Sequence, residues 1–213
     1  MTDDTAVLVF GKSPVPGQVK TRLVPGLSAG QAARLYERML AHALTTAVAS
    51  ALGPVTLHAH PDHRCPRLRA LALRHGTHIA AQAGADLGAR MQHALRLALR
   101  AHRRALLIGS DCPALRGQHL RAADRLLRDG RAAVVLVPAV DGGYVLVGAR
   151  ELCPAMFQDI PWGSARVMAR TRERLRGAHC TWCELPPLRD VDRIQDLDLL
   201  PAALRAPDHP PKF

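Results

Sequence analysis

Short apolar runs alternate with longer stretches in which apolar residues recur at helical spacing, from residue 5 to about residue 197. The stretch 28–52 is the clearest helix, because Ser28 can cap it and Leu35 and Met39 fall on one face. The apolar runs predict strands at 5–10, 55–59, 77–82, 105–109, 132–138, 145–148 and about 180–185. Further helices are predicted at 66–74, from within 83–90 to about 101, at 119–128 and from Ser164 through 175, and the acidic residues of 188–197 are predicted to open a final helix.

Strands that alternate with helices predict a single three-layer α/β/α domain over residues 1–200, with a mostly parallel, seven-stranded mixed sheet. The strand at 145–148 follows a short Asp-Gly-Gly turn, so one antiparallel strand is expected. Residues 201–213 contain four prolines and are predicted to form a loosely ordered tail.

The first strand runs into a loop whose glycines and cations are typical of phosphate-binding sites. Backbone N–H groups near Gly11 and Gly17 can approach an anion, and Lys12, Lys20 and Arg22 can neutralise its charge. Only three of the 29 Lys and Arg residues are lysines, and two of them lie in this loop. The Gly-Lys-Ser sequence is not the end of a Walker A motif, because no glycine stands five residues earlier and prolines follow. A solvated basic turn is the alternative interpretation.

Three carboxylates come at strand ends, where ligands bind in open α/β sheets. Asp111 follows an apolar strand and suits a divalent metal ion, although an Asp there can also cap a turn. Asp141 stands beside Gly142 and Gly143, which either leave room for a substrate or form a hairpin turn. Asp86 lies between two glycines at a strand-to-helix junction, which fits a second ligand-facing loop and an acidic helix start equally well.

Composition narrows the class of partner. A net charge of +11 and a pI near 10.6 suggest nucleic acid as a possible ligand. The arginines are spread over several helices, however, and an aromatic content of 3% leaves few rings for base stacking, so anionic small molecules are favoured.

Cysteine usage and hydropathy bear on the compartment. Five cysteines without secretory context predict reduced thiols, and the pair Cys180 and Cys183 lies in a predicted strand, where a thioredoxin-type pair is not expected. No apolar run approaches the ~20 residues of a membrane span, and residues 1–4 do not resemble a signal peptide. We therefore expect a cytoplasmic protein that does not bind membranes.

Three segments together resemble a known family. They are GKSPVPGQVKTRL at 11–23, GSDCPAL at 109–115 and PAVDGGYVLVG at 138–148, with Asp190-Val191-Asp192 following. In this order they resemble DUF2064, a bacterial family of the GT-A (nucleotide-diphospho-sugar transferase) superfamily. Its members are often labelled glycosyltransferases, and some are linked to arsenosugar biosynthesis. The first loop is also similar to that of phospholactate guanylyltransferase.

The resemblance implies a GT-A fold and a role for each motif. Gly11, Lys20 and Arg22 would contact the nucleotide, and Asp111 and Asp192 would hold Mg²⁺ or Mn²⁺. The nucleotide or acceptor pocket would be lined by Asp86, Gly88, Asp141, Gly142, Gly143 and Tyr144.

One departure from the GT-A pattern affects the metal site. Where typical GT-A glycosyltransferases carry Asp-x-Asp, Cys112 and Pro113 follow Asp111 here, so the second carboxylate must be distant, either Asp192 or Asp190.

These roles predict a metal- and nucleotide-dependent transferase that moves a sugar from a nucleotide-sugar to a small acceptor. Lys20 and Asp111 would be catalytic, and Asp141 would act as a general base for an acceptor hydroxyl. The alternative is a nucleotidyltransferase that joins a nucleoside triphosphate to a phosphorylated molecule and releases pyrophosphate. A third hypothesis is a non-catalytic module that binds nucleotides or RNA. The nucleobase, the sugar, the acceptor and the oligomeric state are left open.

Overall fold

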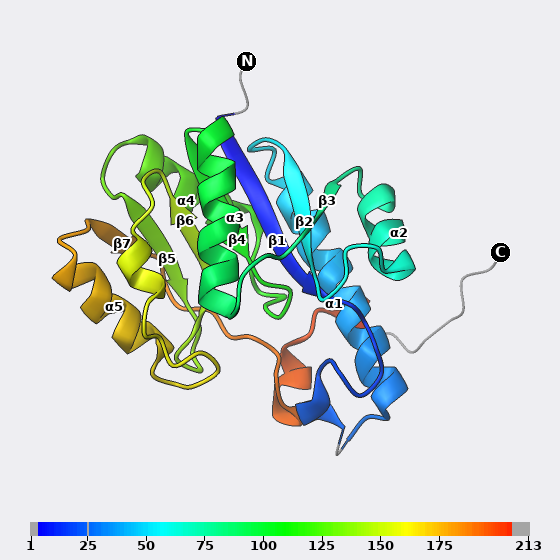
Figure 1. Cartoon of the computed structure of the whole chain (residues 1–213). Helices are drawn as coiled ribbons and strands as arrows, with labels where there is room; N and C mark the ends of the chain where they lie inside the picture. Colours follow the sequence, from blue (N-terminus) through cyan, green and yellow to red (C-terminus); the bar gives the residue numbers. More distant parts are fainter. Residues whose placement is uncertain (1–3, 25, 206–213) are drawn as a thin grey trace.

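A computed structural model describes residues 4–24 and 26–205 and shows one seven-stranded sheet between helices (Figure 1). The strand order is β3-β2-β1-β4-β6-β5-β7. β6 runs antiparallel to both β4 and β5, and the other neighbouring strands are parallel, as predicted. The strands are β1 (Thr5–Lys12), β2 (Val55–His60), β3 (His78–Ala81), β4 (Arg104–Ile108), β5 (Val134–Pro138), β6 (Tyr144–Ala149) and β7 (Trp182–Glu184).

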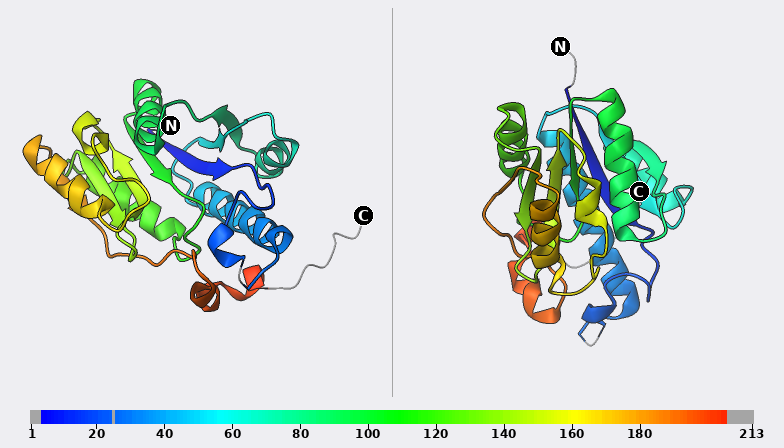
Figure 2. Two further views of the ribbon diagram at one scale, coloured as in Figure 1. Left: turned by 60° about the horizontal axis from the view of Figure 1, so that its bottom comes forward. Right: turned by 60° about the vertical axis from the view of Figure 1, so that its left-hand side comes forward.

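The side chains of the buried central strand β1 point alternately to the two faces of the sheet, and a layer of helices packs on each face. In β1, Val7 and Val9 pack on one face of the sheet, and Leu8 and Phe10 pack on the other. The first face is covered by α1 (Ala29–Ala49), α2 (Pro66–Arg74) and α4 (Gly117–Arg128). The second is covered by α3 (Leu87–Ala101), α5 (Val167–Gly177) and the short helix η2 (Pro154–Phe157), as the views in Figure 2 show. The predicted α/β/α architecture is confirmed.

Most predicted elements are present, with boundaries shifted by a few residues. Ser28 does cap α1: its Oγ accepts from the backbone N of Gln31, whose side chain accepts from the backbone N of Ser28. Ser164, in contrast, does not cap α5. Its hydroxyl donates to the carbonyl of Pro161 within a turn, and α5 begins at Val167.

The C-terminal segment differs most from prediction. The expected final helix is a 3₁₀ helix, η3 (Ile194–Leu199), followed by the short helix α6 (Ala202–Arg205). Leu204 of α6 is buried in a third apolar cluster, so the predicted tail begins with a packed turn. Residues 206–213 of that tail lie outside the described residues.

This third cluster joins segments that are far apart in the sequence. Leu23 of the 3₁₀ helix η1 (Thr21–Leu23), Leu35 and Met39 of α1, and Val191 and Leu204 of the C-terminal segment pack together. Figure 1 shows η1 and the C-terminal segment side by side beneath the carboxyl end of β1. The cluster holds the first loop and residues 191–204 at the same edge of the sheet.

Within the described residues, no helix is long and apolar enough to cross a membrane.

Candidate functional site

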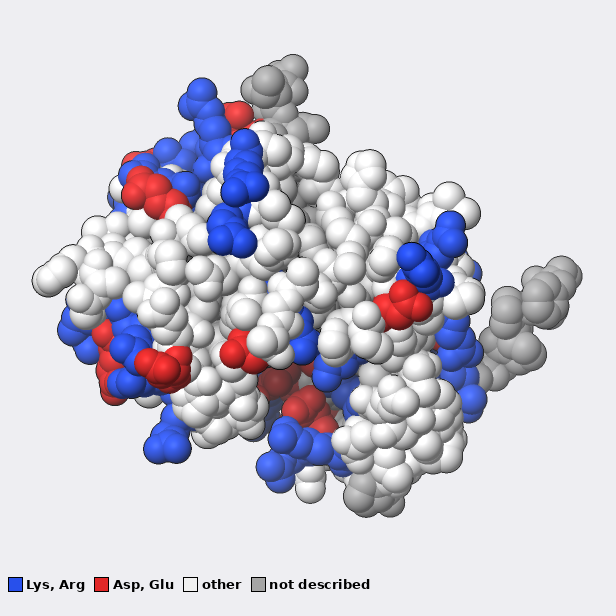
Figure 3. Space-filling view, in the orientation of Figure 1, with Lys and Arg blue, Asp and Glu red and all other residues white. Residues whose placement is uncertain are grey.

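A cavity of about 500 Å³ opens at the edge of the sheet where β1 and β4 end and β6 begins. This is the edge at which open α/β sheets bind ligands. Several of the predicted site residues line the cavity, namely Gly11, Lys12, Lys20, Arg22, Asp111, Asp141, Gly143, Tyr144 and Asp192. Figure 3 shows acidic and basic side chains meeting in a hollow below the middle of the molecule, while other basic side chains are dispersed over the face.

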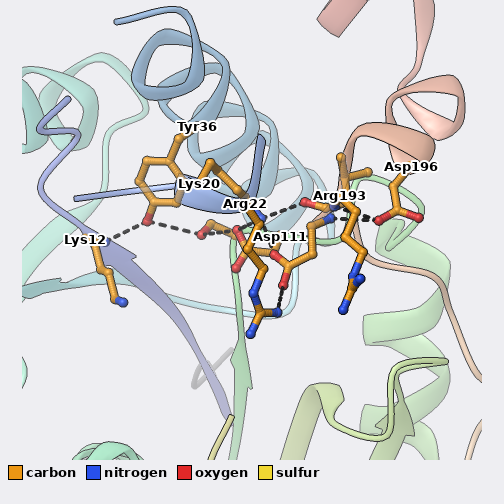
Figure 4. Close-up of polar contacts among 10 residues, drawn as sticks. Lys12, Lys20, Arg22, Tyr36, Asp111, Arg193 and Asp196 are labelled. Atoms are coloured by element: carbon orange, nitrogen blue, oxygen red, sulfur yellow. Dashed lines mark hydrogen bonds and ion pairs between the residues drawn. The ribbon is translucent and has the colours of Figure 1, made fainter. Parts of the chain in front are cut away.

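Lys20 lies at the centre of the polar part of the site. Its Nζ is 2.8 Å from Asp111 Oδ1 and 2.9 Å from Asp192 Oδ1, and it donates to the carbonyl of Val191 at 2.7 Å. The Lys20 side chain is only 4% exposed, whereas those of Asp111 and Asp192 are 47% and 31% exposed. Burial lowers the pKa of Lys20, but the two carboxylates raise it more, so that the net pKa lies above its ordinary value. Lys20 is therefore a charged ammonium held between two aspartates, of which Asp111 is labelled in Figure 4.

Asp111 and Asp192 meet because the C-terminal segment docks along the strand ends. The backbone N of Val191 donates to the carbonyl of Asp111 at 2.8 Å, and the thiol of Cys112 donates to the carbonyl of Arg189 at 3.4 Å. These contacts place the second carboxylate next to the first, although no Asp-x-Asp motif supplies it.

Asp192 has a second cationic partner. Its Oδ2 is 3.0 Å from Nη1 of Arg22, whose side chain is 59% exposed. Burial raises the pKa of Asp192, but Lys20 and Arg22 outweigh burial, so the net pKa lies below its usual value. Two of the three predicted cations of the first loop, Lys20 and Arg22, thus contact the predicted metal ligand directly.

Tyr36 of α1 supports the same corner and was missed by the sequence reasoning. Its hydroxyl accepts from the backbone N of Lys12 at 2.7 Å and from the Oγ of Ser110 at 3.2 Å, linking the ends of β1 and β4 (Figure 4). Burial, followed by the nearby charge of Asp111, raises the pKa of Tyr36 to about 12. The sequence did contain a signal for this residue: Tyr36 is one of only two tyrosines, and its hydroxyl lies on the apolar face of the predicted helix, where it needs a hydrogen-bond partner.

Two further acidic residues, Asp141 and Asp190, line the cavity. Asp141 follows β5, and its Oδ1 accepts from the backbone N of Gly143 at 2.9 Å, so the Asp-Gly-Gly sequence forms the hairpin turn. Asp141 and Gly143 line the cavity. Asp190 lines the cavity too, and burial, with Asp141 and Asp192 nearby, raises its pKa to about 6.

Four predicted site residues do not line the cavity. Asp86 caps α3 by accepting from the backbone N of Ala89 at 2.8 Å. A Cβ on Gly88 would lie 2.7 Å from Trp162, so this glycine lets α3 pack against a residue of the cavity wall. Gly142 has φ +96, and its Cβ would lie 2.1 Å from the carbonyl oxygen of Ala165. Gly17 has φ +78 and faces open space. Asp86, Gly88 and Gly142 therefore stabilise the elements around the cavity, and Gly17 lies in the first loop outside it.

The apolar part of the cavity was not predicted. It is lined by Phe10, Leu87, Met91 and Trp162, and the rings of Tyr144 and Trp162 meet edge to face at 6.2 Å. Gln82 and Arg90 also line it. These residues come from β1, β6, α3 and two loops, so no single motif marks them.

Asp111 and Asp192 have the donor set that a divalent cation prefers. An oxygen of each already lies within 3 Å of the same positive charge, and both side chains are partly open to the cavity. Mg²⁺ is commonly bound by one or two carboxylates, with waters and substrate phosphates as its remaining ligands. Within residues 4–24 and 26–205, no group of three or more His, Cys, Asp or Glu side chains is placed to share a metal ion. The pair fits such a metal site only if the substrate completes it.

Comparisons with known proteins agree with this architecture. Residues 40–164 match the family model described as "Uncharacterized protein conserved in bacteria (DUF2064)". A crystal structure from Desulfovibrio desulfuricans G20, named "putative nucleotide-diphospho-sugar transferase", is 34% identical over 93% of this chain and 86% of its own, with a TM-score of 0.83. No curated protein sequence matches the chain.

Two more distant structures share the fold alone. CMP:2-keto-3-deoxy-manno-octonic acid synthetase, complexed with CTP, is 12% identical, with a TM-score of 0.59 over 92% of this chain and 95% of its own. Glucosyl-3-phosphoglycerate synthase from Mycobacterium tuberculosis, in complex with Mn²⁺, UDP and glucosyl-3-phosphoglycerate, is 11% identical, with a TM-score of 0.56 over 90% of this chain and 73% of its own.

Proposed function

The chain belongs to the DUF2064 family, and on that premise we propose that it is a nucleotide-dependent transferase that uses Mg²⁺ or Mn²⁺ to move a sugar from a nucleotide-sugar to a small acceptor. The observation that carries the proposal is the convergence of Lys20, Asp111 and Asp192 in one cavity at the carboxyl edge of the sheet. Transfer from a nucleotide-sugar depends on neutralising the negative charge of the leaving diphosphate. The two aspartates would do this by holding a metal cation, and Lys20 would do it with its own charge.

The residues divide into two roles around the transferred group. Asp111 and Asp192 would hold the cation, which when bound stabilises negative charge on the leaving phosphates. Lys20 and Arg22 would add positive charge from the first loop, and Lys12 lines the same cavity. Trp162, Met91 and Leu87 form the apolar wall of the cavity, against which an uncharged part of the substrate would pack.

Nucleotidyl transfer is the second candidate, and the cations of the first loop favour it. A triphosphate carries more charge than a nucleotide-sugar, and Lys20 and Arg22 both face the acidic pair that would bind the metal. The fold is also that of a synthetase whose structure contains CTP. The D. desulfuricans protein, named for nucleotide-diphospho-sugar transfer, keeps glycosyl transfer first.

A thermal-shift panel tests the proposal. Nucleoside triphosphates and nucleotide-sugars are each added with Mg²⁺, with Mn²⁺ and with neither. We expect one nucleotide-sugar with metal to raise the unfolding midpoint by roughly 5–10 °C. A ligand at 100 times its Kd adds about 2.7 kcal/mol to the free energy of unfolding, and in a protein of this size each kcal/mol raises the midpoint by about 2–4 °C. Stabilisation by a triphosphate alone would establish nucleotidyl transfer instead. Salt-sensitive binding of RNA with no nucleotide response would support the binding-module hypothesis and contradict both enzymes.

Asp141→Asn separates the two reactions. Asparagine keeps the acceptor for the Gly143 backbone N, so the turn is preserved, but it cannot take a proton from an acceptor hydroxyl. We expect kcat for glycosyl transfer to fall by about 10²- to 10³-fold in assays of nucleoside diphosphate release. A phosphate nucleophile needs no base, so pyrophosphate release from a triphosphate would be unchanged. Unimpaired glycosyl transfer by the variant would remove Asp141 as the base.

A further inference from the structure

Lys20 has an arrangement that a simple phosphate-binding lysine does not need. All three directions of its ammonium are used inside the protein, by Asp111, Asp192 and the carbonyl of Val191. With its side chain 4% exposed, Lys20 has no free hydrogen-bond donor for a phosphate while these contacts last. A role in nucleotide binding therefore requires Lys20 to leave them.

We propose that the Lys20 ammonium occupies, in the ligand-free protein, the position between Asp111 and Asp192 that the divalent cation takes, so that cation and lysine compete for the two carboxylates. The inference rests on the proposed function, because it presumes that this pair is the metal site. A divalent ion and an ammonium within 3 Å of the same two oxygens would repel each other strongly, so the two cannot occupy that place together.

The surrounding structure allows the side chain to move without unfolding the loop. Leu23 and Val19 are buried and anchor the segment on either side of Lys20. Lys20 itself has φ 48 and ψ 39, a left-handed conformation that is unfavourable for a residue with a Cβ. Its three polar contacts offset that cost, and a release of the side chain would free the backbone to relax.

The displaced ammonium would remain at the cavity, because Lys20 lines it. On leaving the carboxylates it gains three free donors beside the bound cation, which is where the phosphates of a nucleotide would lie. Metal and nucleotide would then bind cooperatively: the metal releases the lysine, and the phosphates stabilise it in its released position. Without nucleotide, the lysine keeps metal affinity low.

Lys20→Met tests the competition directly. Methionine keeps an unbranched apolar stem as far as the Cε position and removes the ammonium, and the partly exposed aspartates remain open to solvent. Mn²⁺ binding to the full chain, without nucleotide, is measured from the electron paramagnetic resonance signal of free Mn²⁺. We expect the variant to bind Mn²⁺ about tenfold more tightly than the wild type. In the wild type, Mn²⁺ must break two partly exposed ion pairs and a hydrogen bond of Lys20 before it binds, and the variant lacks these contacts.

Lys12→Met is the matched control. Lys12, the last residue of β1, is the other lysine that lines the cavity; it is exposed and makes no ion pair within the described residues. The control removes the same charge from the same cavity without touching the carboxylate pair, so its Mn²⁺ affinity should stay within about twofold of the wild type. An equal gain in both variants would assign the effect to general electrostatics and overturn the proposal.

The remaining outcomes separate the inference from the function on which it rests. Wild-type Mn²⁺ affinity in Lys20→Met would overturn the competition and leave the metal-dependent transferase standing. Absence of Mn²⁺ binding in wild type and both variants, even with nucleotide, would overturn the metal-dependent function itself.

A second measurement covers the case in which Lys20→Met fails to fold. Because the chain has only three lysines, wild-type protein labelled with ¹³C at lysine Cε gives three signals, which Lys12→Met helps to assign. We expect Mg²⁺ to shift the Lys20 signal towards that of a free lysine. A Lys20 signal unmoved by Mg²⁺ at concentrations that saturate binding would overturn the proposal.

Discussion

Replacing Asp111 with asparagine is expected to lower metal-dependent turnover by about a thousandfold, which corresponds to about 4 kcal/mol of lost transition-state stabilisation. Asp111 lies at the end of the buried strand β4, and one of its oxygens shares the Lys20 ammonium with Asp192. Asparagine keeps the shape and one acceptor oxygen but removes half of the formal negative charge of the pair. The cation would then be held weakly and in a poor position. Release of nucleoside diphosphate or of pyrophosphate, measured against Mg²⁺ concentration, follows the loss for either reaction.

Asp129→Asn is the control for this experiment. Asp129 directly follows α4 and pairs with the neighbouring Arg128, where both side chains are about half exposed. Its replacement should leave turnover and Mg²⁺ dependence unchanged. If Asp111→Asn keeps turnover within tenfold of the wild type at the same Mg²⁺ concentration, Asp111 does not hold the cation and the metal site must be sought elsewhere.

The parts of the fold that could be predicted are those with local signals. The alternation of β1, the capping box at Ser28 and the glycine turns each depend on neighbouring residues, so periodicity and cap residues reveal them. The end of the chain was predicted less well. Whether residues 194–199 form an α helix or a 3₁₀ helix depends on their packing against Leu23 and α1, which is a long-range contact that no local pattern records.

In the site, too, the residues with local sequence signals could be predicted, and the contacts between distant segments could not. Lys20, Asp111 and Asp141 could be selected because each stands at a strand end or in the first loop. The ion pairs between Lys20 and the two aspartates could not, because they depend on the C-terminal segment docking through Val191 and Arg189. Tyr36 was missed for a related reason: on a helix face, a buried tyrosine that joins two strand ends looks the same as one that only fills the core.

The edge of the sheet opposite the site contains a buried charge that should dominate stability. Asp124 of α4 is 5% exposed and accepts from the hydroxyl of Thr5 at 2.6 Å and from Nε of Arg104 at 2.7 Å. Thr5 and Arg104 begin β1 and β4, the two strands whose other ends deliver the first loop and Asp111. The pair thus joins a helix to the start of both site-bearing strands.

Asp124→Ala is expected to lower the free energy of unfolding by about 3–5 kcal/mol, because it leaves the guanidinium of Arg104, whose side chain is 11% exposed, buried without its counter-charge. Urea denaturation measures the change, and Asp129→Ala, which breaks an exposed pair on the same helix, should cost no more than about 1 kcal/mol. Adding Arg104→Met to Asp124→Ala should recover much of the loss, since the uncompensated charge is then gone. A loss below about 1 kcal/mol in Asp124→Ala would mean that water reaches Arg104. Because the pair lies at the amino ends of β1 and β4, the folded variant should keep the wild-type affinity for Mn²⁺ and nucleotide, which separates the stability of these strands from the chemistry at their carboxyl ends.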